Sequence, residues 1–242
     1  MNPTLVVLGF SGLAAAAASL GVLPLIGRDR IPGRWMGWAS ALAAGMMLGS
    51  AYVLAEAGLV RQVLAGAGGA LLGILYIHWT HWVLGTGDLD LDDLAPQAGD
   101  YAYKVILVGT LHSASEGLAI GVAMALDLSL GVFVAVAMAI HNIPEATVLA
   151  AVVRSGGARL GQAAGLAVAV NVSQVLLAVT VFAVVTAAPA TLIWMLGFAV
   201  GTLMHLVMVE LLPQSYREAG PTSIGLVVSV ATGIVVLLRG FQ

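Results

Sequence analysis

Two pairs of side chains that can ligate a metal lie near the middle of the chain. His112 is followed four residues later by Glu116 in LVGTLHSASEGLAIGVAMAL, and His141 is followed at the same spacing by Glu145 in VFVAVAMAIHNIPEATVLAAVV. Residues four apart lie on the same face of a helix, so each pair can direct an imidazole and a carboxylate at one point. The two pairs are also equally spaced from each other, histidine to histidine and glutamate to glutamate. Two consecutive helices would therefore present the same two ligands.

This set of ligands suits a divalent transition metal. Imidazole nitrogen and carboxylate oxygen bind Zn²⁺, and they also accept Fe²⁺, Mn²⁺ or Cd²⁺. The chain has no cysteine, which excludes thiolate ligands. Pro144 cannot donate to the carbonyl of Ile140, so that oxygen is freed beside the second pair. One His–Glu pair in a membrane is equally well explained by hydrogen bonding between helices. Two equally spaced pairs favour a metal site.

The composition indicates an integral membrane protein. Of the 242 residues 60% are hydrophobic and only 9% are charged, and the mean hydropathy is +1.04. Soluble domains carry about 25% charged residues. The net charge is −3 and no basic run is present, which argues against a nucleic-acid partner. The first apolar stretch is longer than the core of a signal peptide and predicts a first membrane helix.

The apolar segments predict a single all-α domain over residues 1–242 with eight transmembrane helices. About 20 apolar residues span a bilayer, and charged or Pro/Gly-containing breaks separate the segments. The expected helices cover 4–26, 36–57, 62–84, 103–126, 130–153, 160–186, 191–212 and 221–239. Three glycine pairs have the GxxxG spacing that permits close helix contacts, namely Gly45/Gly49, Gly117/Gly121 and Gly197/Gly201. For any single pair, ordinary tolerance of glycine in membrane helices is the preferred interpretation.

The basic residues predict the orientation of the chain. The loops after the first, third, fifth and seventh segments contain seven of them, and the opposite side contains only Arg61 and Arg239. Because cytoplasmic loops are enriched in Lys and Arg, we expect the first set to be cytoplasmic and both termini to be extracellular or periplasmic. The seven are Arg28, Arg30, Arg34, Lys104, Arg154, Arg159 and Arg217. We expect a multi-pass protein of the plasma or inner membrane.

The motifs HSASEG at 112–117 and HNIPEA at 141–146 resemble the paired motifs of the ZIP (Zrt/Irt-like) divalent metal transporters. The stretch AAGMMLGSAYVLAEA at 43–57 is similar to the second helix of that family, and FAVGTLMHLVMVELLP at 198–213 is similar to its seventh. The resemblance covers most of the chain. It implies uptake of a divalent cation, most of all Zn²⁺, toward the cytoplasm by a homodimer in the lipid bilayer. It also implies a transport unit of helices 1, 4, 5 and 6 that moves against helices 2, 3, 7 and 8.

The resemblance further implies the site residues. Its ligands would be His112, Glu116, His141 and Glu145, with Met47 as a soft contact. A second metal position that occurs in some members would fall on Ser113, Asn142 and Gln174. None of these three is charged, so we expect one well-held metal and a weak or absent second one. The metal is cargo, and no cofactor is expected.

Several alternatives stay open at this point. An intramembrane hydrolase or oxidase with the same ligands would need a general base or further ligands that the two motifs do not supply. A haem-binding electron carrier is disfavoured by the strict His–Glu pairing, and a passive channel fits as well as a carrier. We interpret His78 and His81 as an interfacial pair without a ligand, with an exit-side metal contact as the alternative. His205 is interpreted as an interhelical hydrogen-bonding residue and Glu210 as a helix-end or gating carboxylate. The acidic loop 85–100 is interpreted as a solvated loop rather than a cation site.

Overall fold

The computed structural model describes residues 2–28, 31–59, 62–84 and 100–241, which are helical except for short turns. Two of the helices begin at residues that are typical N-caps. Asn2 caps the first helix by accepting a hydrogen bond from the amide of Thr4 at 3.0 Å, and Pro3 follows it. Asp127 caps another helix by accepting from the amide of Leu130 at 2.8 Å. Such caps satisfy amides that have no partner within the helix.

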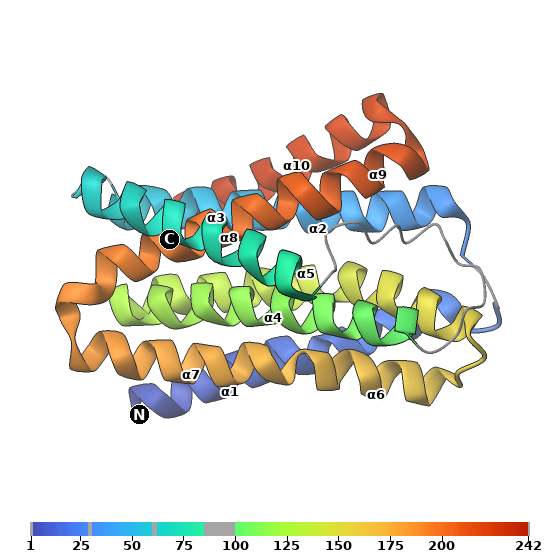
Figure 1. Ribbon diagram of the computed structural model, residues 1–242, viewed down its shortest axis with the longest axis horizontal. Coiled ribbons are helices and arrows are strands. Elements are labelled where there is room, and N and C mark those ends of the chain that lie inside the picture. The colour runs from blue at the N-terminus through green and yellow to red at the C-terminus, as the bar shows by residue number, and fades with distance from the viewer. Residues whose placement is uncertain (1, 29–30, 60–61, 85–99, 242) are drawn as a thin grey trace.

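The bundle is built from long helices that lie roughly along one axis (Figure 1). The α-helices are α1 (Pro3–Ala17), α2 (Gly33–Gly58), α3 (Val63–Leu84), α4 (Asp100–Leu126), α5 (Leu128–Ser155), α6 (Leu160–Val170), α7 (Val172–Ala187), α8 (Leu192–Leu206), α9 (Leu212–Ala219) and α10 (Pro221–Gly240). Other helical segments that join them in the described residues are the 3₁₀ segments η1 (Ala18–Leu25) and η3 (Pro189–Thr191) and the π-helical turn η4 (Val207–Leu211).

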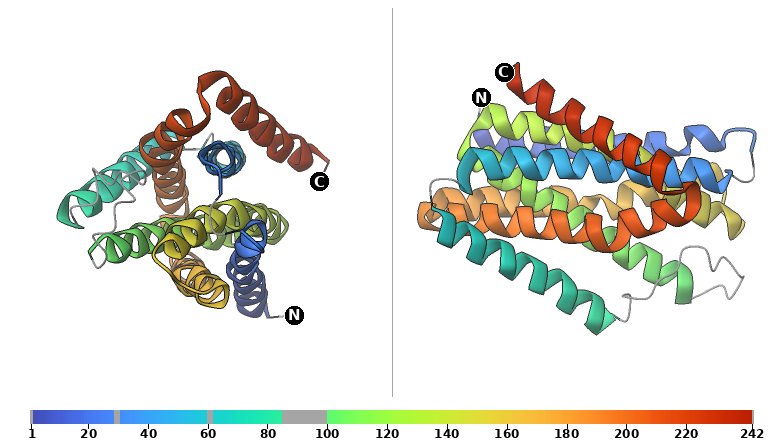
Figure 2. Two further views of the ribbon diagram at one scale, coloured as in Figure 1. Left: turned by 90° about the vertical axis from the view of Figure 1, so that its right-hand side faces the viewer. Right: turned by 90° about the horizontal axis from the view of Figure 1, so that it is seen from above.

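These elements form eight stretches long and apolar enough to cross a membrane among the described residues. The prediction of an all-α protein with eight membrane helices is confirmed. Both termini lie at the same end of the bundle (Figure 2), as an even number of crossings requires. The sixth and seventh stretches are composite, since α6 and α7 are separated at Asn171 and α8 continues through η4 and α9 to Ala219. The seventh prediction therefore ended too early.

The helices pack as two groups that meet along one seam. In the first group, α1 and η1 pack on α5, α4 packs on α5 and α7, and α6 completes the layer. In the second group, α3 packs on α8, and α2 packs on α8, α9 and α10. Across the seam α2 contacts α5 and α4 contacts α8. Figure 1 shows the second group above α4 and α5, with α1, α6 and α7 below them. The partition matches the one that the sequence resemblance implied.

All three glycine pairs make close helix contacts, so the preferred interpretation of simple tolerance was wrong. A methyl group added at Gly117 or Gly121 would collide with the backbone of α7 at Gln174 or Ala178. The same addition at Gly197 or Gly201 would collide with the backbone of α3. Gly45 and Gly49 lie against α10 in the same way. Each pair joins two helices of the same group, which ties the helices of that group closely together.

Helix α5 runs without a break through Pro144. Proline removes one intrahelical hydrogen bond, yet the helix continues for more than two further turns to Ser155. In the described residues, irregular backbone within membrane stretches lies elsewhere, in η1, at Asn171 between α6 and α7, and in the π-helical turn η4. The last two lie in helices that flank α4.

Candidate metal centre

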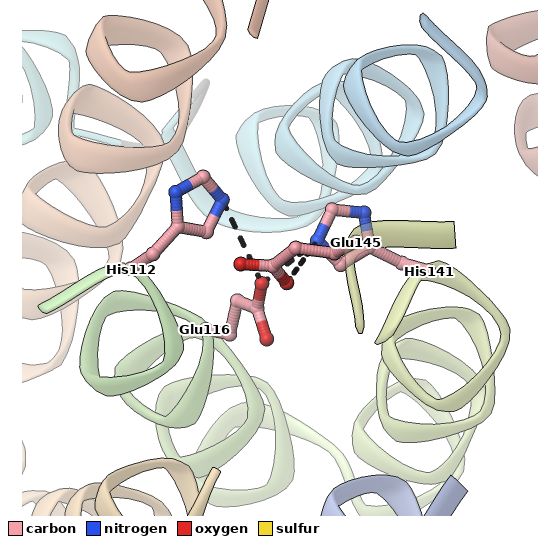
Figure 3. Close-up of side chains that lie close together, drawn as sticks. All are labelled: His112, Glu116, His141 and Glu145. Atoms are coloured by element: carbon pink, nitrogen blue, oxygen red, sulfur yellow. Dashed lines mark ion pairs between the residues drawn. The ribbon is translucent and has the colours of Figure 1, made fainter. Parts of the chain in front are cut away.

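His112 and Glu116 on α4 face His141 and Glu145 on α5 (Figure 3). One ligand atom from each residue can be chosen so that all four lie within 4.8 Å of one another. His141 Nε2 is 2.8 Å from Glu116 Oε1 and 3.4 Å from Glu145 Oε2, and His112 Nε2 is 3.8 Å from Glu116 Oε1. Ligands of tetrahedral zinc with bonds of about 2.0–2.1 Å are roughly 3.3 Å apart. The distances in the cluster lie on both sides of this value.

The backbone of α2 fixes the orientation of one imidazole. His141 Nδ1 lies 3.0 Å from the carbonyl oxygen of Ala43. A carbonyl oxygen only accepts, so Nδ1 carries the hydrogen and Nε2 is turned toward the two carboxylates. Metal-binding histidines usually donate their second ring nitrogen in this way, which fixes the tautomer and the ring. Nε2 lies 2.8 Å from Glu116 Oε1, and a divalent cation would bind to the deprotonated forms of both groups.

The cluster is withdrawn from the surface. Glu116 and His141 are fully buried, and His112 is 3% exposed. Apart from their ion pairs with the imidazoles, both oxygens of Glu116 and Oε2 of Glu145 lack a hydrogen-bond donor. Two buried carboxylates without sufficient donors are costly, and a bound cation would offset that cost. Glu145 is the most accessible of the four, with a side chain that is 20% exposed.

Met47 lies where the resemblance implied a soft contact. Its Sδ is 3.3 Å from His112 Nε2, and the side chain is fully buried. The rings of His112 and His141 are nearly parallel, with centroids 6.1 Å apart. The thioether therefore borders the cluster on the α2 side, at the seam between the two helix groups.

Ser113, Asn142 and Gln174 are buried beside the cluster and hydrogen-bond elsewhere. Asn142 Nδ2 donates to the carbonyl of Ala14 and to Gln174 Oε1, both at 2.9 Å. Ser113 Oγ donates to Asn171 Oδ1 at 3.2 Å. Each of Ser113 and Asn142 immediately follows a histidine of the cluster, so its side chain points to the neighbouring face of the helix. These residues form a neutral network between α4, α5, α7 and the turn at Asn171.

Glu210 is a neighbour of the cluster that the sequence analysis did not place there. Its Oε2 is 3.8 Å from His112 Nδ1, and its Oε1 is 2.8 Å from His81 Nε2. His81 is buried and paired with Glu210, and the interpretation of His78 and His81 as an interfacial pair stays a prediction. His78 is exposed, and its ring meets His205 edge-on with centroids 6.3 Å apart. The spacing of Glu210 in the sequence gave no sign of its partners, which belong to other helices.

The acidic loop at 85–100 falls almost entirely outside the described residues. Residues 85–99 lie outside the described residues, and α4 begins at Asp100. The expectation that this loop is solvated therefore stays a prediction.

Comparison with known proteins identifies the class of this protein. Residues 92–238 match the sequence model of the ZIP zinc transporter family. The chain is 31% identical over 223 residues to a candidate zinc transporter of Arabidopsis thaliana, covering 89% of this chain and 35% of that protein. It is 30% identical over 220 residues to the zinc transporter GufA of Myxococcus xanthus, covering 85% of this chain and 86% of that protein.

The fold and the cluster define a polytopic membrane protein with a buried His/Glu site between two of its helices. With the matches above, the chain belongs to the ZIP zinc transporter family. The family is one of transporters, which confirms the expectation that this protein is not an enzyme. The chain spans about a third of the length of the Arabidopsis relative and most of the Myxococcus one.

Proposed function

We propose that this protein carries Zn²⁺ across the membrane toward the cytoplasm, binding it at His112, Glu116, His141 and Glu145. The observation that carries the proposal is the convergence of these four side chains from α4 and α5, with buried carboxylate oxygens that lack donors. Two carboxylates balance the charge of one dication, and two imidazoles complete four-coordination. Fe²⁺, Mn²⁺ and Cd²⁺ suit the same ligands. The names of both relatives support zinc as the cargo.

The packing of the helices supports a carrier rather than a fixed pore. The four ligands belong to one helix group, while Met47 and Glu210 approach them from the other group across the seam. A shift of one group against the other would expose the cluster to one side and then to the opposite side, as in other transporters. The distribution of basic residues orients the bundle with both termini outside, in the plasma or inner membrane.

The neutral network at Ser113, Asn142 and Gln174 supports a single well-held cation. Asn142 Nδ2 donates to the carbonyl of Ala14 and to Gln174 Oε1, while Asn142 Oδ1 and Gln174 Nε2 are buried without a hydrogen-bond partner. A second dication there would find no carboxylate of its own and would have to share the two glutamates. A weak or absent second position remains our expectation.

Uptake of Zn²⁺ into proteoliposomes tests the proposal. The wild type should show saturable uptake, and Glu116→Gln with Glu145→Gln should abolish it, because the substitutions keep the side-chain shape and remove both charges. Glu56→Gln is a matched control, since Glu56 is exposed near the end of α2. Competition by Cd²⁺, Fe²⁺ and Mn²⁺ would rank the cargo.

The outcomes separate the alternatives. Uptake that is unchanged in the double variant would overturn the site. Uptake that rises linearly with Zn²⁺ concentration and persists after crosslinking α2 to α5 would indicate a channel. The homodimer stays a prediction, and it can be measured as the mass of the protein particle in detergent.

A further inference from the structure

A hydrophobic groove lies on the seam between the two helix groups. It is lined by Leu42 and Met46 on α2, by one face of α5 within 133–140 and by one face of α10 within 231–238. All of its lining residues are hydrophobic, and its volume is about 200 Å³. Because α5 belongs to the first group and α2 and α10 belong to the second, a molecule in the groove would contact both groups.

The walls of the groove are open to the side of the bundle. Val136 on α5 and Ile234 on α10 both line it, and their side chains are 46% and 50% exposed. At membrane depth such surfaces face hydrocarbon, because polar groups without partners are costly there. A transmembrane helix is about 10 Å across with its side chains, which is too wide for a groove of this volume. A single hydrocarbon chain is narrow enough to enter it.

Two arginines stack on tryptophans at the start of α2. The guanidinium carbon of Arg34 lies 5.3 Å from the ring centroid of Trp38, and that of Arg28 lies 5.5 Å from the ring centroid of Trp35. All four side chains are exposed, and Trp38 Nε1 donates to Ser223 Oγ on α10 at 3.4 Å. The cation–π contacts hold the guanidinium groups in place, and the N–H groups of arginine bind phosphate well.

A carboxylate already occupies the N-terminal end of α2. Glu218 on α9 lies against Gly33, at the point where the helix dipole attracts negative charge. A further anion at this end would therefore bind to the arginine side chains and not to the amides of the helix. The two guanidinium groups outnumber this carboxylate by one charge.

Trp38 connects the charged end of α2 to the groove. Leu42 and Met46 follow it by four and eight residues, so they lie on the same side of the helix, about 6 and 12 Å farther along it. One leaflet contributes about half of the 30 Å hydrocarbon core. A hydrocarbon chain that begins beside Trp38 can therefore extend past Met46 while its phosphate stays at the arginines.

We propose that an anionic phospholipid binds at this place, with its phosphate at Arg28 and Arg34 and one acyl chain in the groove between α5 and α10. In the proposed orientation the lipid belongs to the cytoplasmic leaflet, whose surface is rich in anionic lipids. The acyl chain contacts the first helix group through α5 and the second through α2 and α10. The inference is independent of the proposed cargo.

Native mass spectrometry of the purified protein, titrated with phosphatidylglycerol or phosphatidylcholine of the same chain length, tests the site. The wild type should bind one phosphatidylglycerol at least fivefold more tightly than phosphatidylcholine. Arg28→Gln with Arg34→Gln should weaken phosphatidylglycerol binding by about tenfold or more, since each basic residue near the membrane surface adds to the attraction. Arg159→Gln is the control and should change it less than twofold, because Arg159 is exposed at the start of α6 in the opposite layer of the bundle (Figure 1).

A second pair of variants tests the position of the acyl chain. Val136→Trp with Ile234→Trp fills the groove from both walls and should weaken phosphatidylglycerol binding at least fivefold. Val230→Trp with Leu237→Trp adds bulk at exposed positions of α10 that do not line the groove, and it should leave binding within twofold. Glycerol phosphate, which has no acyl chains, should not bind. Circular dichroism and the thermal midpoint of each variant check that it folds.

Four outcomes would overturn the proposal. Phosphatidylglycerol binding that is unchanged in both the arginine variant and the groove variant would show that the lipid does not bind here. Equal binding of the two lipids would exclude recognition of the anionic head group, and binding of glycerol phosphate would assign the arginines to a soluble phosphate. A dimer in lipid-free detergent that dissociates only when the groove is filled would assign the groove to a second copy of the chain.

Discussion

Adjacent residues on the same two helices build two clusters of opposite character. His112 and His141 belong to a charged cluster with unmatched carboxylate oxygens. Ser113 and Asn142, one residue later on each helix, belong to a neutral network of hydroxyl and amide groups. Asn142 donates there to Gln174, although Asn142 Oδ1 and Gln174 Nε2 have no hydrogen-bond partner. Consecutive residues of a helix differ by about 100° in direction, so the two clusters lie on neighbouring faces of α4 and α5.

The difference shows how the same helices combine binding and cohesion. A buried polar group with its partners rigidifies the packing, and the network joins α5 to α1 and α7 in that way. A buried carboxylate without sufficient donors is held at a cost that a cation relieves. One face thus joins the helices of its group, and the other is the face at which we propose that the cation binds.

Loss of one ligand from the charged cluster should give the largest effect. His141→Ala removes the nitrogen that lies 2.8 Å from Glu116 and the contact with the carbonyl of Ala43. We expect Zn²⁺ affinity to fall about 100-fold or more, since loss of an outer hydrogen-bond partner alone costs about 10–100-fold. Calorimetric titration measures this. Gln174→Ala should keep the Zn²⁺ affinity within about threefold and lower the free energy of unfolding by about 1–3 kcal/mol. Equal losses of Zn²⁺ affinity in the two variants would show that the charged cluster and the neutral network do not differ in metal binding.

Carboxylates placed in the neutral network should allow it to bind a cation, as we propose for the charged cluster. Asn142→Asp with Gln174→Glu adds two charges next to the glutamates of the cluster. Because like charges need a counter-ion there, the bound Zn²⁺ should rise from one equivalent to two. Metal analysis after equilibrium dialysis measures the stoichiometry. Asn142→Leu with Gln174→Leu is the matched pair without charge and should stay at one; a stoichiometry of two in that pair would contradict the assignment.

The packing beneath the neutral network should tolerate no added methyl group. At Gly117 a methyl would collide with the backbone of Gln174, whereas at Gly165 on α6 it would meet open space. We expect Gly117→Ala to destabilise the protein by about 1–3 kcal/mol through overpacking. Gly165→Ala should stabilise it by about 0.5–1 kcal/mol through helix propensity. Thermal unfolding in detergent compares the two variants. Similar unfolding midpoints would show that α7 shifts to accommodate the methyl group at little cost.

The smallest effect is expected at Met47, which borders the charged cluster without charge of its own. Met47→Leu conserves volume and removes the sulfur that lies 3.3 Å from His112. Zn²⁺ affinity should fall by about twofold to threefold, and Cd²⁺ affinity by about tenfold, since soft cations gain more from a thioether. Competition titrations of both cations give the ratio. An equal loss of affinity for Zn²⁺ and Cd²⁺ would mean that Met47 contributes by packing and does not contact the cation.

The sequence was sufficient for features that depend on spacing along one helix. Hydropathy located all eight membrane stretches, because each must span about 30 Å of hydrocarbon. The two His–Glu pairs could be predicted to share a face, since four residues make about one α-helical turn. The structure brings all four side chains together between α4 and α5. Whether they bind the metal is for the titrations above.

Contacts between distant helices could not be predicted in this way. Glu210 was interpreted as a helix-end or gating carboxylate without a predicted partner, because its contacts are with other helices, α3 and α4. The glycine pairs were underestimated for the same reason, since a close approach depends on the partner backbone. Likewise, the sequence named Asn142 and Gln174 as ligands by resemblance, and only the fold shows that they bond to each other.

The π-helical turn at Val207–Leu211 has a consequence for insertions and deletions in this part of the chain. Such a turn accommodates one extra residue within an otherwise α-helical segment. Removal of a residue there would restore regular winding while α8 and α9 keep their places, but Glu210 would rotate by about 100° away from His112. A single codon deleted at this point would therefore separate the Glu210 carboxylate from His112 without any substitution.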